Sequence, residues 1–127
     1  MQTVSVQIDT KLEAEHGVVA DYRDQFFGYF GWPTVARMDD GTLVAVSSGL
    51  RNDHVCPFGR TTICTSTDDG ESWTPPRVIN DTPLDDRDAG ISSLGGRNLL
   101  MSWFSVDSRG AHPSEYENSL SSHEAAR

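Results

Sequence analysis

An all-β fold of antiparallel strands is the class that the sequence predicts. Two apolar segments, 32–38 and 42–47, flank an Asp-Gly dipeptide at 40–41, which is a strong signal for a β-hairpin. A second pair of apolar segments, 89–94 and 98–104, flanks two glycines at 95–96. Apolar residues of the two hairpins match at positions 35 and 91, 38 and 94, 43 and 99, and 44 and 100, a spacing of 56 in every case. The chain is therefore expected to contain an internal repeat.

The bulk composition fits one small globular domain and excludes some classes of partner. The chain has 127 residues, of which 36% are hydrophobic and 23% are charged. Its net charge of −9 argues against binding to nucleic acids or to anionic membrane surfaces. No apolar stretch approaches the roughly 18 residues of a membrane span, and the first residues lack the basic and apolar regions of a signal peptide. The compartment stays unknown, with a slight preference for the cytoplasm.

The two cysteines, Cys56 and Cys64, are not arranged as a Cys-x-x-Cys pair. We expect two free thiols rather than a disulfide. With His54 they fall short of the ligand spacing of zinc sites. We therefore expect no metal and no cofactor.

The segment before the first hairpin is predicted to contain short strands and a dense aromatic cluster. Val4, Val6 and Ile8 alternate with polar residues, which is typical of a half-buried strand. Residues 11–16 form a polar connection, and 18–20 are expected to form another short strand. The aromatic residues that follow are either a hydrophobic plug or a platform on which a sugar stacks. They are Tyr22, Phe26, Phe27, Tyr29, Phe30 and Trp32.

The first hairpin is followed by a polar loop at 48–60, a strand at 62–64, a tight turn and a strand at 77–79. Pro75 and Pro76 place this last strand at an edge of the sheet. Four strands thus run up and down in one sheet. After Ser105 the hydrophobic pattern ends. The polar segment 106–127 is predicted to be a partial helix, with Ser114 as its N-cap, or disordered.

The tight turn has the pattern Ser-x-Asp-x-Gly-x-x-Trp, from Ser66 to Trp73. The carboxylate of Asp68 can bond the backbone that follows, and Gly70 accepts a positive φ without steric cost. Trp73 then stands one step into the next strand, where its ring can pack under the turn. The residues thus predict a β-corner that caps itself.

This corner resembles the Asp-box, or BNR repeat, of the sialidase (neuraminidase) superfamily and agrees with it at all four fixed positions. The stretch from Tyr29 to Ala45 is similar to the opening of sialidases. The resemblance implies part of a six-bladed β-propeller with antiparallel four-stranded blades. Residues 1–127 are then its N-terminal part, about one and a half blades. The first full blade is at 30–80, a second blade begins at 87–105, and a polar tail occupies 106–127.

The resemblance also supplies candidate residues in the loop after the second strand. Arg51 corresponds to an arginine of the substrate pocket, and Asp53 to the aspartate that acts as general acid and base. On the residues alone, these two can equally be a solvent-exposed ion pair of the loop. Both assignments are expectations from the family.

A second group of charges, 85–88, precedes the strand that opens the second hairpin. Asp88 matches an aspartate that contacts a sugar hydroxyl in the family, and Arg87 is a second candidate for binding substrate. A salt-bridged turn is the alternative. The family's first arginine, which helps to clamp the carboxylate of sialic acid, falls here on Gly31. This departure favours a glycosidase for another sugar, or a related lyase.

The function that the resemblance implies is an exo-glycosidase that acts on terminal sugars, with exo-α-sialidase as one form of it. The family mechanism is retaining, with a tyrosine nucleophile supported by a glutamate. These residues and most of the arginines would come from later blades, so the chain by itself is expected to be inactive. The alternative is a non-catalytic Asp-box propeller that binds a glycan or a protein.

Overall fold

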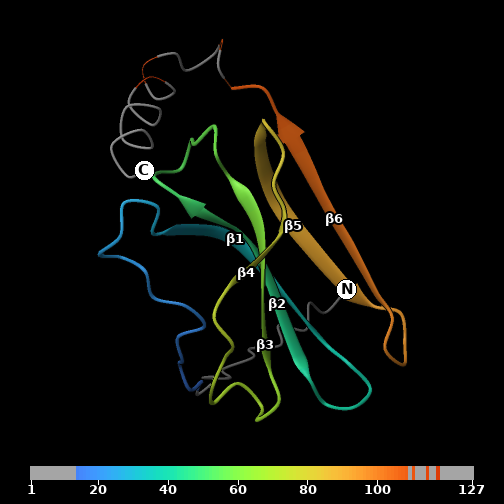
Figure 1. Cartoon of the computed structure of the whole chain (residues 1–127). Helices are drawn as coiled ribbons and strands as arrows, with labels where there is room; N and C mark the ends of the chain where they lie inside the picture. Colours follow the sequence, from blue (N-terminus) through green and yellow to red (C-terminus); the bar gives the residue numbers. More distant parts are fainter. Residues whose placement is uncertain (1–13, 109, 111–113, 115–116, 118–127) are drawn as a thin grey trace, which may run out of the picture.

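The computed structural model describes residues 14–108, 110, 114 and 117. The six elements assigned there are all β-strands, arranged in two antiparallel sheets (Figure 1), which confirms the predicted all-β class. The predicted strand at 4–8 and most of the predicted tail at 106–127 lie outside the described residues. The strands are β1 (Tyr29–Arg37), β2 (Leu43–Arg51), β3 (Arg60–Ser66), β4 (Arg77–Asn80), β5 (Asp85–Ser93) and β6 (Leu99–Val106).

The first sheet contains β1, β2, β3 and β4 in chain order, and the second contains β5 and β6. Val44 and Val46 on β2 are 1% exposed and form the centre of the core. They alternate with half-buried residues along β2, as expected for a strand with two different faces. β4 is the outer strand and follows Pro75 and Pro76, as the sequence predicted.

Two strands begin earlier than their apolar residues indicated. β1 begins at Tyr29 rather than at Trp32, and β5 begins at Asp85 rather than at Ala89. In β5 the early residues are charged, yet Asp85 and Asp86 are fully buried. Their charge is satisfied by an ion pair and hydrogen bonds, so burial does not require an apolar side chain at these positions.

The internal repeat is visible in the pairing of the strands. Thr34 pairs with Val46 in the first hairpin, and Gly90 pairs with Ser102 in the second. Both members of the second pair lie 56 positions after their counterparts, from 34 to 90 and from 46 to 102. The next three pairs towards each turn keep the same spacing. The two hairpins are therefore built on one register.

The hairpins also share an irregularity at equivalent positions. The register shifts between Gly31 and Thr34 in β1, and between Arg87 and Gly90 in β5. Trp32 has φ 50° and Asp88 has φ 51°, and these two residues are again 56 positions apart. A positive φ is uncommon for residues other than glycine and marks a bulge that redirects side chains. The repeat thus reproduces a strained bulge as well as the regular strand.

The acidic corner between β3 and β4 is closed by its own side chains. Ser66 Oγ accepts a hydrogen bond from the Gly70 N–H (2.9 Å) and donates one to Asp68 Oδ1 (2.7 Å). Asp68 Oδ1 accepts from the Ser72 N–H (3.0 Å), and the Trp73 indole N–H donates to the Gly70 carbonyl (3.1 Å). Hydrogen bonds from Ser72 lower the pKa of Asp68 to about 2. The self-capped turn is confirmed, but Trp73 lies before β4 (Arg77–Asn80) and not within that strand, as the sequence had predicted.

The two sheets pack on each other through β5, which contacts β1 and β2 (Figure 1). Thr34 Oγ1 donates to the Ala89 carbonyl (2.8 Å), and Ser48 Oγ donates to the Asp86 carbonyl (2.7 Å). Ser48 alternates with Val46 and Val44 along β2, so these three side chains share the face that is directed at β5. The core therefore lies between the two hairpins.

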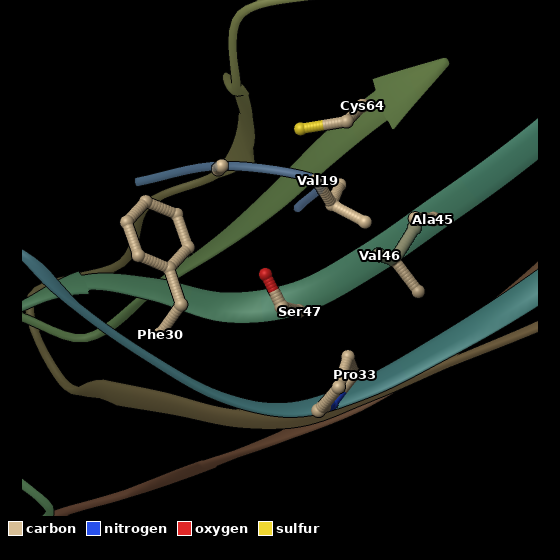
Figure 2. A pocket seen from close by; sticks show the side chains of 8 residues that line it. Val19, Phe30, Pro33, Ala45, Val46, Ser47 and Cys64 are labelled. Carbon is tan, nitrogen blue, oxygen red and sulfur yellow. The ribbon is translucent and has the colours of Figure 1, made fainter. Parts of the chain in front are cut away.

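The predicted short strand at 18–20 is wrong, because these residues have no strand pairing. They pass over the opposite face of the first sheet instead. Figure 2 shows Val19 beside Ala45 and Cys64, with Phe30 and Pro33 along the same small cavity. The apolar character of this segment reflects packing on the sheet rather than membership of it. Cys64 is buried here, and both it and Cys56 are free thiols, as predicted.

Candidate functional site

One cluster forms where the end of β2 lies beside the starts of β1 and β5. It brings together the two charged groups that the sequence predicted, which are the loop after β2 and residues 85–88. Arg51 ends β2, Trp32 lies in the bulge of β1, and Arg87 lies at the bulge of β5. The carbon Cζ of Arg87 lies 4.7 Å from the centre of the Trp32 ring, and that of Arg51 lies 5.3 Å from it. The His54 ring packs at 5.0 Å on the same indole. Trp32 is thus the centre of the cluster.

Arg51 is fully buried and is held on all sides. Its Nη1 lies 2.6 Å from Asp85 Oδ1, and its Nη2 lies 2.9 Å from Asp85 Oδ2, which is the bidentate geometry of a strong ion pair. Nη1 also donates to Ser48 Oγ (2.8 Å), and Nη2 donates to the His54 carbonyl (3.0 Å). Nε donates to the Asp53 carbonyl (3.3 Å). A direct bond from Arg51 to a substrate would require one of these acceptors to be displaced.

Arg87 is held less completely and reaches solvent. Its side chain is 17% exposed, its Nη1 lies 3.7 Å from Asp85 Oδ2, and its Nη2 donates to the His54 carbonyl (3.3 Å). The Nε atom is buried and has no hydrogen-bond partner among the described residues. A buried donor without a partner is uncommon in folded proteins. Arg87 therefore has an unused donor within the cluster.

Asp53 and Asp88, the predicted carboxylates, are both exposed. Asp53 Oδ1 accepts a hydrogen bond from the N–H of His54 (2.6 Å), which fixes the side chain against its own loop. Asp88 occupies the positive-φ position of the β5 bulge. The structure places both near the cluster along the chain, one residue from His54 and one from Arg87. Their predicted contacts with substrate stay predictions.

Asp85 and Asp86 are buried residues that sequence reasoning did not assign. Asp85 forms the ion pair with Arg51. Asp86 accepts hydrogen bonds from the N–H and the hydroxyl of Thr82 (2.8 and 2.9 Å) and from the Ser105 hydroxyl. Asp86 thus ties the turn before β5 to the end of β6. No signal in the sequence separates these two aspartates from Asp88, because their partners lie far away along the chain.

Trp32 and His54 are the other residues whose place in the cluster the sequence did not reveal. Trp32 was predicted only as one member of the aromatic cluster. In the structure that cluster divides, because Tyr22 packs on Phe30 at 5.7 Å whereas Trp32 faces the arginines. The packing of Tyr22 on Phe30 agrees with a hydrophobic plug, and the stacking of a sugar on Trp32 stays a prediction.

Two features limit the chemistry available at the cluster. They are the burial of its cysteine and the number of side chains that could bind a metal ion. Burial raises the pKa of the Cys56 thiol, so this cysteine is protonated at neutral pH and is a poor nucleophile. No set of three or more His, Cys, Asp or Glu side chains within the described ranges is arranged to hold a metal ion. In the same part of the chain, no helix is long and apolar enough to cross a membrane. What the cluster offers is a guanidinium, an indole, an imidazole and exposed carboxylates.

Comparison with models of protein families found no family that matches the chain. Comparison with curated proteins likewise found no match.

Proposed function

We propose that the chain is part of a sialidase-like exo-glycosidase, built as a partial six-bladed propeller, that binds a terminal sugar at the cluster around Trp32. The observation that carries this proposal is the guanidinium of Arg87, which is 17% exposed, lies 4.7 Å from the centre of the Trp32 ring and has no hydrogen-bond partner for its Nε among the described residues. Sugar recognition uses this combination, because an aromatic ring packs on the apolar face of the sugar and charged groups bond its hydroxyls.

The repeat supports the propeller part of the proposal. Two hairpins with the same register and the same bulge pack face to face, and the first continues into a four-stranded sheet. Sheets that repeat in this way around an axis make a propeller. The corner closed by Ser66, Asp68 and Trp73 is the feature that ties this propeller to the sialidase type.

The roles of the residues follow from their exposure. Arg87 donates to a carboxylate or hydroxyl of the sugar, and Asp88 accepts from a second hydroxyl. Asp53 is the general acid and base, since its carboxylate is exposed and lies in the loop that carries this residue in the family. Arg51 serves the substrate through the loop that it holds, because its own donors are directed at Asp85 and backbone carbonyls. Gly31, which stands where the family has its first carboxylate-binding arginine, leaves the identity of the sugar open.

Binding is the first test, because it does not require the nucleophile that a later blade would supply. Titration of the whole chain with methyl glycosides of N-acetylneuraminic acid, glucuronic acid and galactose, followed by calorimetry, is expected to show binding of an acidic sugar. Arg87→Ala is expected to weaken this binding at least about tenfold, the loss of one charged hydrogen bond. Arg23→Ala is the matched control, because Arg23 is an exposed arginine paired with Asp21. Equal binding by both variants, or no binding of any sugar, would contradict the proposed site.

The alternative is a propeller that binds glycans without catalysis. Substitution of Asp53 distinguishes the enzyme from this binding module. In an enzyme, Asp53→Asn in a protein that includes the later blades abolishes the release of a chromogenic aglycone and leaves sugar binding intact. In a binding module, sugar binding is present while no glycoside of a panel is cleaved by any form of the protein. The exposed carboxylate of Asp53 beside the cluster favours the enzyme.

A further inference from the structure

A small cavity lies between the first sheet and the segment of the chain that precedes it. Its volume is about 190 Å³. Strands β1, β2 and β3 line it from one side, and the segment before β1 lines it from the other (Figure 2). The lining side chains include Phe30, Ala45 and Cys64 on the strands and Val19 and Ala20 in the segment. The cavity is thus bounded on both sides by this chain itself, whatever covers the outer faces of the sheets.

The lining of the cavity offers water few partners. Its polar side chains are those of Ser47 and Cys64. Thr62 Oγ1 donates to the Ser47 carbonyl (3.2 Å), so Ser47 Oγ is the donor in the contact between the two hydroxyls (2.9 Å). The Cys64 thiol is a weak donor, and burial raises its pKa, which keeps it uncharged at neutral pH. A buried water typically makes about three hydrogen bonds, more than this pair of side chains supplies.

The size of the cavity matches a small apolar molecule. In other proteins an apolar cavity of about 150 Å³ stays dry and binds benzene or xenon. At about 190 Å³ this cavity has room for a molecule of that size. The Phe30 ring borders it (Figure 2), and a second aromatic ring can meet Phe30 edge to face. Volume and lining therefore point to the same class of ligand.

The segment over the cavity is lightly held, which gives a ligand a way in. Val18 is 67% exposed and Val19 is 41% exposed. Within the described part of the chain, no backbone–backbone hydrogen bond joins residues 14–20 to the sheet. Few buried contacts and few backbone hydrogen bonds are the features of segments that open locally while the rest of the fold stays intact. Residues 14–20 can therefore move aside without disrupting β1, β2 and β3.

We propose that this cavity is a binding site for a small apolar molecule or group, of the size of a benzene ring or a branched hydrocarbon. The ligand lies against the Phe30 ring and the Ala45 methyl group, beside the Cys64 sulfur, and Val19 and Ala20 cover it. Recognition depends on shape and on the removal of apolar surface from water. The proposal does not rest on the proposed sugar site.

The test titrates the whole chain, with carbon-13 in the methyl groups of alanine and valine, with benzene and with pyrazine, and follows the methyl resonances by NMR. Benzene is expected to shift the resonances of Val19, Ala20 and Ala45 until the site is saturated. Pyrazine has the same shape and is expected to bind at least about tenfold more weakly, because its ring nitrogens would lose hydrogen bonds to water without gaining a donor. Equal affinity for the two probes would overturn the apolar assignment, and the absence of a saturable shift would overturn the site.

Two variants fill the cavity from opposite sides. Ala20→Leu fills it from the covering segment and Ala45→Ile fills it from β2, and each is expected to weaken benzene binding at least about tenfold. Ala14→Leu is the matched control, because Ala14 is exposed in the same segment and does not line the cavity. Far-ultraviolet circular dichroism checks that each variant is folded. Binding that survives both filled variants, or that is lost equally in Ala14→Leu, would overturn the proposal.

Alkylation of Cys64 measures occupancy in the original chain and requires no variant. Iodoacetamide treatment followed by peptide mass spectrometry reports this cysteine separately from Cys56. At about ten times its dissociation constant, benzene leaves about a tenth of the sites free, so alkylation of Cys64 is expected to slow about tenfold. Pyrazine at the same concentration is the control and is expected to slow it much less. An unchanged rate with benzene would show that the ligand does not lie beside Cys64 and would overturn the proposal.

Discussion

Breaking the buried ion pair between Arg51 and Asp85 from one side should strongly destabilise the fold. Both side chains are 0% exposed, and the two bonds between them measure 2.6 and 2.9 Å. Asp85→Asn keeps the size of the side chain but leaves a buried guanidinium without its counter-charge. Breaking a buried pair from one side costs about 3–5 kcal/mol. Since folded domains are stable by only about 5–15 kcal/mol, the variant is expected to lose a large part of its free energy of unfolding.

Urea unfolding followed by tryptophan fluorescence measures this loss. Asp81→Asn is the matched control, because Asp81 is 52% exposed and pairs with Arg60 at 3.1 Å on the surface, where a pair contributes about 0–1 kcal/mol. The double variant Arg51→Met/Asp85→Asn removes the orphaned charge and should recover part of the loss. Equal free energies of unfolding for Asp85→Asn and Asp81→Asn would refute the reasoning.

Two further predictions concern the same fold. The pKa of Asp68 is lowered to about 2. The stability that its carboxylate contributes is therefore complete above its ordinary pKa of 3.8 and is lost as the pH falls towards 2. Acid unfolding of Asp68→Asn should show less of this pH dependence, and an unchanged profile would contradict the prediction. Gly59→Ala places a methyl group in steric overlap with Arg51 Nη1 and Asp85 Oδ1, so it should destabilise by about 1–3 kcal/mol or more in urea unfolding. Gly110→Ala, whose methyl group meets no atom of the described residues within 4 Å, should not.

The sequence was most informative where a side chain and its backbone partner are close in the chain. The corner at Ser66 and Trp73 and the turn at Gly41 depend on local hydrogen bonds and positive φ, so the turn residues alone predict them. The alternation of apolar and polar residues predicted the central part of each hairpin, because it too depends only on residues that are close in the chain. It failed at Asp85, because alternation cannot identify a strand position whose buried side chain is charged.

The candidate site was harder to predict, because its contacts join residues far apart in the chain. Arg51 and Asp85 are separated by 34 positions, and neither residue type predicts burial by itself. The resemblance to sialidases drew attention to Arg51, Asp53, Arg87 and Asp88 as one set of polar residues. Only the three-dimensional packing distinguishes the two arginines. The donors of Arg51 are used within the protein, whereas the Nε donor of Arg87 has no partner among the described residues.

The two arginines of the cluster meet at a single acceptor, and this contact links stability to the proposed binding. The His54 carbonyl accepts from Arg51 Nη2 (3.0 Å) and from Arg87 Nη2 (3.3 Å). Asp85 lies next to both guanidiniums. A change at Asp85 should therefore alter the position of Arg87 as well as the stability of the fold, whereas a change at Arg87 should alter binding with little effect on stability. Arg51 thus fixes the two groups, the His54 carbonyl and Asp85, that also hold the guanidinium of Arg87.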